Sequence, residues 1–123
     1  MKVSLLMVIT FLYSILPVAG QNIPIEKAKE HIGDSITVCS KVYGTKIITN
    51  PKGDTLTLIN LGAAYPNQLL TVVIKPGNRK NFSYQPEEYL KTKNICVSGI
   101  VEQYKDAIQI EIKDEQHIAV TKN

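Results

Sequence analysis

Apolar and polar residues alternate with a period of two along several short segments of this chain, which is typical of half-buried β-strands. The alternation is clearest near the C-terminus, where three isoleucines share one parity and Gln109 and Glu111 share the other. Gly44 interrupts the first apolar pattern and permits a bend or bulge there. We predict five strands, at residues 35–43 (resuming at 46–48), 55–61, 68–75, 94–104 and 107–112.

The same alternation predicts which side of each strand faces the core. We expect the inward residues to be Ile36, Val38, Val42, Leu56, Leu58, Leu70, Val72, Ile74, Ile95, Val97, Val101, Ile108, Ile110 and Ile112. On the outer side of the second and third strands we expect Thr55, Thr57, Ile59, Thr71, Val73 and Lys75.

Two short helices are predicted, one before the first strand and one between the third and fourth strands. Pro24 suits the first turn of a helix over residues 24–31, and Gly33 is placed to end it. Pro86 and two glutamates favour one or two helical turns over residues 86–91. The tail after the last strand contains Ile118 and Val120, which we expect to pack against the strands.

The segments GDSITVCSKVYGTK, LINLGAAYPNQLLTVVI and KNICVSGIVEQYKDAIQIEI follow the order three strands, short helix, two strands. This arrangement resembles small secreted bacterial OB-fold proteins and the OB modules of tRNA-anticodon type, over nearly all of residues 21–123. The resemblance implies an all-β, five-stranded OB-fold barrel with a short N-terminal helix and a short helix between strands three and four. Closure of the barrel removes the exposed strand edges of an open sheet. OB barrels serve many tasks, so the fold does not determine the function.

The first twenty residues have the three parts of a secretory signal peptide. Lys2 gives a positive start, an apolar run follows, and small residues precede an expected cut after Gly20. We therefore predict a signal peptide at residues 1–20 and one OB-fold domain at residues 21–123, in a secreted or periplasmic protein. An uncleaved membrane anchor is the alternative, but the apolar run is short for a span of about 20 residues.

The two cysteines, Cys39 and Cys96, belong to a chain that we expect to enter an oxidising compartment. They lie on the first and fourth strands, which are antiparallel neighbours in an OB barrel, and both have the parity opposite to the inward residues. Cross-strand Cα separations of ~4.5–5.5 Å suit a disulfide. We predict a Cys39–Cys96 disulfide on the outer side of the barrel; two free thiols under the N-terminal helix are the alternative.

The net charge of +3 is too small to indicate a polyanionic partner by itself, but the charge is unevenly distributed. Residues 41–93 contain eight basic and three acidic side chains. Residues 21–40 contain two basic and three acidic side chains, and residues 94–123 contain three basic and five acidic side chains. The positive excess therefore lies in the middle of the chain, which includes the second and third strands.

The resemblance implies a binding face, because OB-folds usually bind through strands two and three and through the loops joining strands one to two and four to five. The candidate ligand-binding residues on or near that face are Lys46, Lys52, Tyr65, Lys75, Arg79, Lys80 and Tyr104, with Phe82 and Tyr84 nearby. Cations interleaved with aromatic rings suit single-stranded nucleic acid. Strands two and three themselves contain no outward ring, so the usual stacking platform is missing from the sheet.

The residues give little support for catalysis or metal binding. The two histidines, His31 and His117, are not part of a Ser/His/Asp arrangement, and adjacent Glu87 and Glu88 point apart. Staphylococcal-type nucleases are also OB barrels, but their chemistry uses two arginines with a carboxylate, and Arg79 is the only arginine here. The cysteines and histidines do not match zinc-ligand spacing. We expect a protein that is not an enzyme and that has no cofactor or metal.

Two functions are consistent with these features. One is binding of single-stranded nucleic acid, with the five candidate cations contacting phosphates and Tyr65 and Tyr104 stacking on bases. The other is a cell-envelope interaction module that binds protein, glycan or a small ligand through the same face. The expected compartment favours the second, because nucleic acid is not the obvious partner there. After signal cleavage we expect no membrane span.

Overall fold

The computed structural model describes residues 21–122, so the predicted signal peptide lies outside the described residues. The strands in this range are β1 (Gln21–Asn22), β2 (Ser35–Thr49), β3 (Thr55–Leu61), β4 (Leu70–Ile74), β5 (Asn94–Tyr104), β6 (Ala107–Glu111) and β7 (Ile118–Val120). The helices are η1 (Ile25–His31), η2 (Pro76–Asn81), α1 (Pro86–Tyr89) and η3 (Glu115–His117), where η marks a 3₁₀ helix. Within residues 21–122, no helix is long and apolar enough to cross a membrane.

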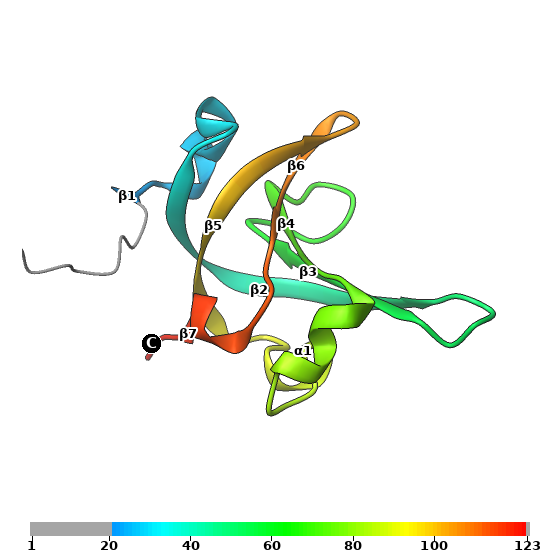
Figure 1. Ribbon diagram of the computed structural model, residues 1–123. Coiled ribbons are helices and arrows are strands. Elements are labelled where there is room, and N and C mark those ends of the chain that lie inside the picture. Colours follow the sequence, from blue (N-terminus) through cyan, green and yellow to red (C-terminus); the bar gives the residue numbers. More distant parts are fainter. Residues whose placement is uncertain (1–20, 123) are drawn as a thin grey trace, which may run out of the picture.

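Five of these strands form a closed ring in the order β2-β3-β4-β6-β5, and β5 returns to β2 (Figure 1). Neighbouring strands are antiparallel except for β4 and β6, which are parallel. β2 pairs with β5 along its first half and with β3 along its second, and the register shifts between Val42 and Gly44. The all-β, five-stranded barrel and the bulge near Gly44 are therefore confirmed.

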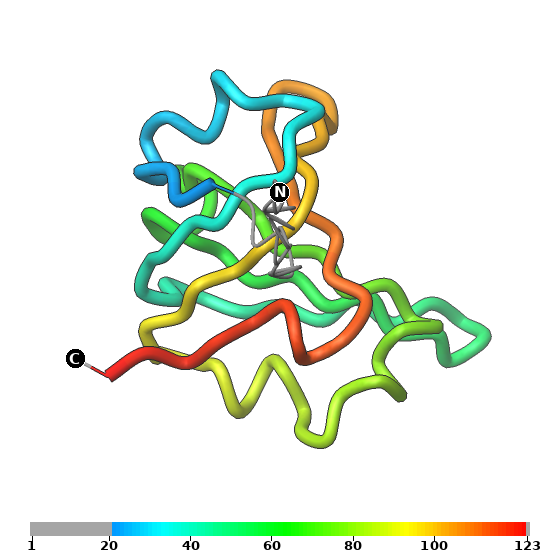
Figure 2. Tube along the Cα trace, turned by 60° about the vertical axis from the view of Figure 1, so that its left-hand side comes forward, coloured from blue at the N-terminus to red at the C-terminus, as the bar shows by residue number. Residues whose placement is uncertain are grey.

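The helices cover the two ends of the barrel. η1 lies at one end and places Ala28 in the core, whereas η2, α1 and the segment after them lie at the other end (Figure 2). Phe82 and Leu90 are buried from that side. The tail packs on the barrel as expected, because Ile118 is buried where β7 pairs with β5, although Val120 stays partly exposed.

Some predicted boundaries were wrong. The chain after the third strand forms the 3₁₀ helix η2, which the strand and helix patterns did not predict. The second helix ends at Tyr89 rather than residue 91. Thr92, three residues further on, adopts a left-handed backbone conformation with φ +64°. The third strand begins at Leu70, two residues later than predicted, because the chain before it forms a loop closed by a hydrogen bond from the Leu69 N–H to the Leu61 carbonyl.

The barrel interior contains the inward residues predicted for β2, β4 and β5. At β6 and just after it, Ile110 and Ile112 are buried as predicted, whereas Ile108 is only partly buried against the core. β3 is the exception, because Leu56 and Leu58 face outward and Ile59 is fully buried. Both parities of this strand are apolar, so alternation alone could not decide between them. The strand pairing determines which side of β3 faces the core. Ile59 is opposite the inward Val72 of β4, and paired residues share a face of the sheet.

The predicted disulfide is present in the structure. Cys39 and Cys96 are cross-strand partners whose Cα atoms lie 4.0 Å apart, and their sulfurs are bonded. Both follow the outward parity, and the neighbouring outward pair, Thr37 and Ser98, is joined by a 2.7 Å hydrogen bond between the two hydroxyls. The alternative of two free thiols is therefore wrong.

Removing the disulfide should destabilise the barrel without changing its fold. The bond joins residues 57 positions apart and so restricts the unfolded chain. Its loss raises the conformational entropy of the unfolded state and thereby favours unfolding. We expect Cys39→Ala/Cys96→Ala to lower the free energy of unfolding by about 2–4 kcal/mol, measured by urea unfolding. An unchanged urea midpoint with an unchanged slope would contradict this expectation.

Candidate ligand-binding groove

An apolar groove of about 420 Å³ crosses the outer surface of β3 and β4. Leu56 and Leu58 of β3 and Val73 of β4 line it at the centre. Ile48 lines it near the β2–β3 turn, and Tyr104 lines it beside the β5–β6 turn. The groove therefore lies between the two turns that the resemblance implied for ligand binding, and the β2–β3 hairpin beside it projects from the barrel (Figure 1).

The outward leucines are a direct result of strand pairing. Leu58 is paired with Lys46 of β2 on one side and with Val73 of β4 on the other, and Leu56 is paired with Ile48. Because paired side chains share a face, all five belong to the outer surface. The sequence prediction placed the leucines in the core and Thr57 outside, so it missed the apolar character of this face.

A second, more polar pocket of about 360 Å³ continues the groove under the β3–β4 loop. Its lining residues are Gly44, Thr45, Lys46, Leu58, Asn60, Tyr65, Gln68 and Thr71. Leu58, Gln68 and Thr71 line both parts, so the two parts form one continuous surface. Sequence reasoning missed Asn60 and Gln68; the only signal for Asn60 was a polar residue within an otherwise apolar strand.

The structure brings four of the predicted ligand-binding residues together around this surface. Lys46 and Tyr65 line the polar pocket, whereas Lys75 and Tyr104 line the apolar groove. Tyr65 is 76% exposed and Tyr104 is 58% exposed, so both rings are accessible. Lys75 lies 3.5 Å from the carboxylate of Glu111, which partly offsets its positive charge.

The other predicted residues lie elsewhere. Lys52 is exposed in the β2–β3 turn, where its backbone N–H donates to the Asn50 side-chain oxygen over 2.9 Å. Lys80 is exposed on η2. Phe82 is in the core, and the ring of Tyr84 lies against Tyr89 with 4.4 Å between centroids. Among residues 21–122, no carboxylate lies within salt-bridge distance of Lys46, Lys52 or Lys80.

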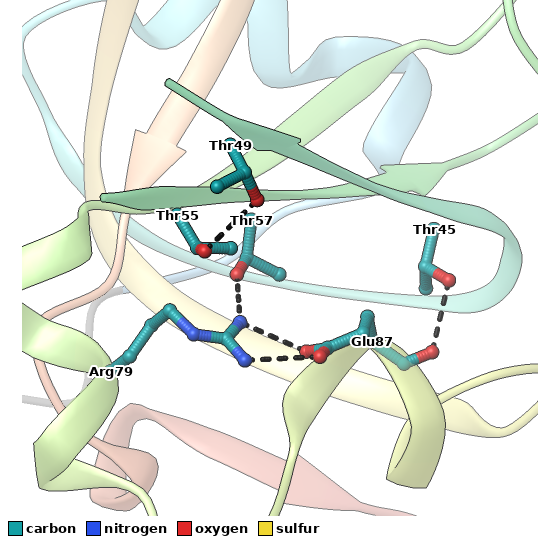
Figure 3. A network of polar contacts seen from close by, with 6 residues as sticks. All are labelled: Thr45, Thr49, Thr55, Thr57, Arg79 and Glu87. Atoms are coloured by element: carbon teal, nitrogen blue, oxygen red, sulfur yellow. Dashed lines mark hydrogen bonds and ion pairs between the residues drawn. The ribbon is translucent and has the colours of Figure 1, made fainter. Parts of the chain in front are cut away.

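Arg79 is held inside a polar network at the end of the barrel (Figure 3). Its guanidinium donates two hydrogen bonds to the Glu87 carboxylate, at 2.9 and 3.0 Å, and a third to the hydroxyl of the buried Thr57. The Thr45 hydroxyl donates to the Glu87 backbone carbonyl over 2.9 Å. The network joins η2 and α1 to strands β2 and β3, so Arg79 has a structural contact here and does not line the groove.

The network makes stability depend on pH through Glu87. Hydrogen bonds from Arg79 hold the pKa of the Glu87 carboxyl below its usual 4.5, although burial opposes this shift. A group whose pKa is lower in the folded state stabilises above its unfolded pKa, and this contribution disappears as the pH falls through the folded pKa. The stabilisation from Glu87 is therefore present at neutral pH and lost in acid.

We expect Glu87→Gln to lower the free energy of unfolding by about 1–3 kcal/mol near neutral pH, because the ionised partner of Arg79 is lost. The difference in the free energy of unfolding between the variant and the wild type should decrease as the pH falls below about 4.5. Urea unfolding at neutral and acidic pH measures both quantities. Glu88→Gln, at the adjacent exposed position, is the matched control; an equal loss in the control would contradict the assignment.

No protein-family model matches the chain, and no curated protein matches its sequence. Solved structures resemble its fold. The crystal structure of yeast Stn1 and Ten1 matches with a TM-score of 0.60 and 11% identity, over 85% of this chain and 64% of that chain. A putative aspartyl-tRNA synthetase from Leishmania major Friedlin matches with a TM-score of 0.51 and 13% identity, over 87% of this chain and 22% of that chain.

The second OB-fold domain of replication protein A from Methanococcus maripaludis scores lower, at 0.47, with 18% identity over 84% of this chain and 97% of that chain. At the identities of the first two matches, the likeness concerns the fold and not the activity. This chain spans about two thirds of the yeast chain and about a fifth of the synthetase chain. Together with the ring order β2-β3-β4-β6-β5, these matches support the conclusion that residues 21–122 form an OB-fold.

Proposed function

We propose that this protein is a non-enzymatic OB-fold binding protein whose groove over β3 and β4 binds single-stranded nucleic acid. The observation that carries the proposal is the position of Tyr65 and Tyr104, the two most exposed large apolar side chains of the described residues. Each lines one part of the same continuous groove, with Lys46 and Lys75 beside them. Rings for bases and cations for phosphates are the two requirements of a single-strand binder.

Each group has a distinct task in this proposal. The faces of Tyr65 and Tyr104 stack on bases, and the leucines between them contact the apolar parts of the strand. Lys46 contacts a phosphate directly, because no described carboxylate neutralises it. Lys52 and Lys80 add positive charge at the β2–β3 turn and on η2, and Lys75 contributes less because it shares its charge with Glu111. Arg79 has no direct role.

The fold comparisons support this proposal only through the fold they share with this chain. One similar chain is a putative aspartyl-tRNA synthetase, an enzyme named for its RNA substrate. We also propose that the protein works in a secreted or periplasmic location. The signal-peptide pattern of residues 1–20 and the Cys39–Cys96 disulfide support this location, because disulfides persist in oxidising compartments.

A second function is favoured by the apolar floor of the groove. Leu56, Leu58 and Val73 offer no group that a phosphate or a base edge can use, and the Lys75–Glu111 pair is electrically neutral. An apolar segment of an envelope protein, or a small apolar ligand, would bury this floor. Salt separates the two functions, because phosphate binding weakens steeply as salt rises and apolar binding does not.

The test is fluorescence anisotropy of labelled single-stranded DNA and RNA at two salt concentrations. If about three phosphates are contacted, raising the salt fourfold should weaken binding about 20-fold. We expect Tyr65→Ala and Tyr104→Ala each to weaken binding about 10-fold through lost stacking. Lys27→Ala, at an exposed cation on η1, is the control and should change binding less than about twofold.

Two results would contradict the proposal: no binding even at low salt, or binding that neither tyrosine variant changes. Salt-insensitive binding to a protein or glycan, found by pull-down or glycan array, would support the second function instead.

A further inference from the structure

A short chain of polar side chains crosses the outer surface of the barrel under the β3–β4 loop. The Thr71 hydroxyl donates to the side-chain oxygen of Asn60 and accepts from the amide nitrogen of Gln68, each over 3.5 Å. Asn60 is only 8% exposed although it belongs to the outward parity of β3. Amides are thus placed in the middle of a surface whose neighbouring positions, Leu58 and Val73, are apolar.

These side chains have unused hydrogen-bonding capacity. Both contacts are at the long limit for a hydrogen bond, so they hold the groups only weakly. The Gln68 Oε1 atom is shielded from solvent and has no hydrogen-bond partner among the described residues. A buried acceptor without a partner is unfavourable, so a ligand that supplies a donor after a small rotation of this amide gains a satisfied hydrogen bond.

The pocket around Gln68 has the volume and the chemical groups that one nucleobase needs. The pocket measures about 360 Å³ and also contains the exposed ring of Tyr65 and the side chain of Lys46. A ring can stack on the face of a base, a cation can contact the adjoining phosphate, and a side-chain amide can both donate to and accept from a base edge.

We propose that this pocket reads one base of the bound strand, and that Gln68 is the residue that makes binding base-selective. The inference rests on the proposed function and deepens it. The apolar groove beside Tyr104 offers mainly stacking and apolar contact, to which every base is suited. In the pocket, a base whose edge cannot pair with both the donor and the acceptor of the amide leaves Gln68 without a partner. The loss of that hydrogen bond lowers the affinity for the wrong base relative to the right one.

The experiment compares the affinities of labelled oligo-dT, oligo-dC and oligo-dA, each about 12 nucleotides long, by anisotropy at low salt. We expect the wild-type protein to distinguish the best from the worst of the three by about 10-fold or more. Gln68→Met keeps the size of the side chain and removes its amide, so the spread should fall below about threefold. Gln85→Met, at an exposed position just before α1 and outside the residues that line the groove and the pocket, is the matched control and should keep the wild-type spread.

Thermal unfolding checks that both variants fold. If Gln68→Met does not, Gln68→Glu replaces the amide donor by an acceptor, and it should change which oligomer binds best. Equal binding of all three oligomers by the wild type, or an unchanged spread in the Gln68 variant, overturns the inference and leaves the proposed function standing. Failure to bind any oligomer overturns the proposed function, and the inference with it.

Discussion

The barrel depends on β2 pairing with two different strands. Its first half pairs with β5 and its second half with β3, and the register shift after Val42 lets one strand serve both. This double pairing closes the ring and sets Cys39 opposite Cys96. Closure also needs a close approach at Gly99, where a Cβ atom would lie 2.5 Å from a side-chain carbon of Ile110.

The register of β2 with β3 also creates the surface that we propose binds ligand. It buries Ile59 and leaves Leu56 and Leu58 on the outside, so the groove has an apolar floor that adjoins the polar side chains of Gln68 and Thr71. At the end of the barrel, Arg79 donates a hydrogen bond to the buried hydroxyl of Thr57 and forms an ion pair with Glu87. Arg79, which the sequence analysis proposed as a phosphate contact, therefore joins η2 to α1 and β3 and does not line the groove.

Sequence patterns predicted most of the fold because the inward parity of β2, β4, β5 and β6 could be assigned from their apolar residues. The disulfide followed from the same parity once β2 and β5 were taken as neighbours. β3 could not be assigned, since LTLINL is apolar on both faces and only its partners select one. The Arg79–Glu87 pair and the role of Gln68 depend on loops and helices whose positions no strand pattern predicts.

The most direct test of this account places a charge on each face of β3 in turn, with Leu58→Glu and Ile59→Glu compared by thermal unfolding and by oligonucleotide anisotropy. We expect Leu58→Glu to fold and to lose binding, because the new carboxylate repels phosphates in the groove. We expect Ile59→Glu to fail to fold, because the carboxylate would be buried without a partner. A folded Ile59→Glu protein alongside an unfolded Leu58→Glu protein would contradict the assigned faces and the groove built on them.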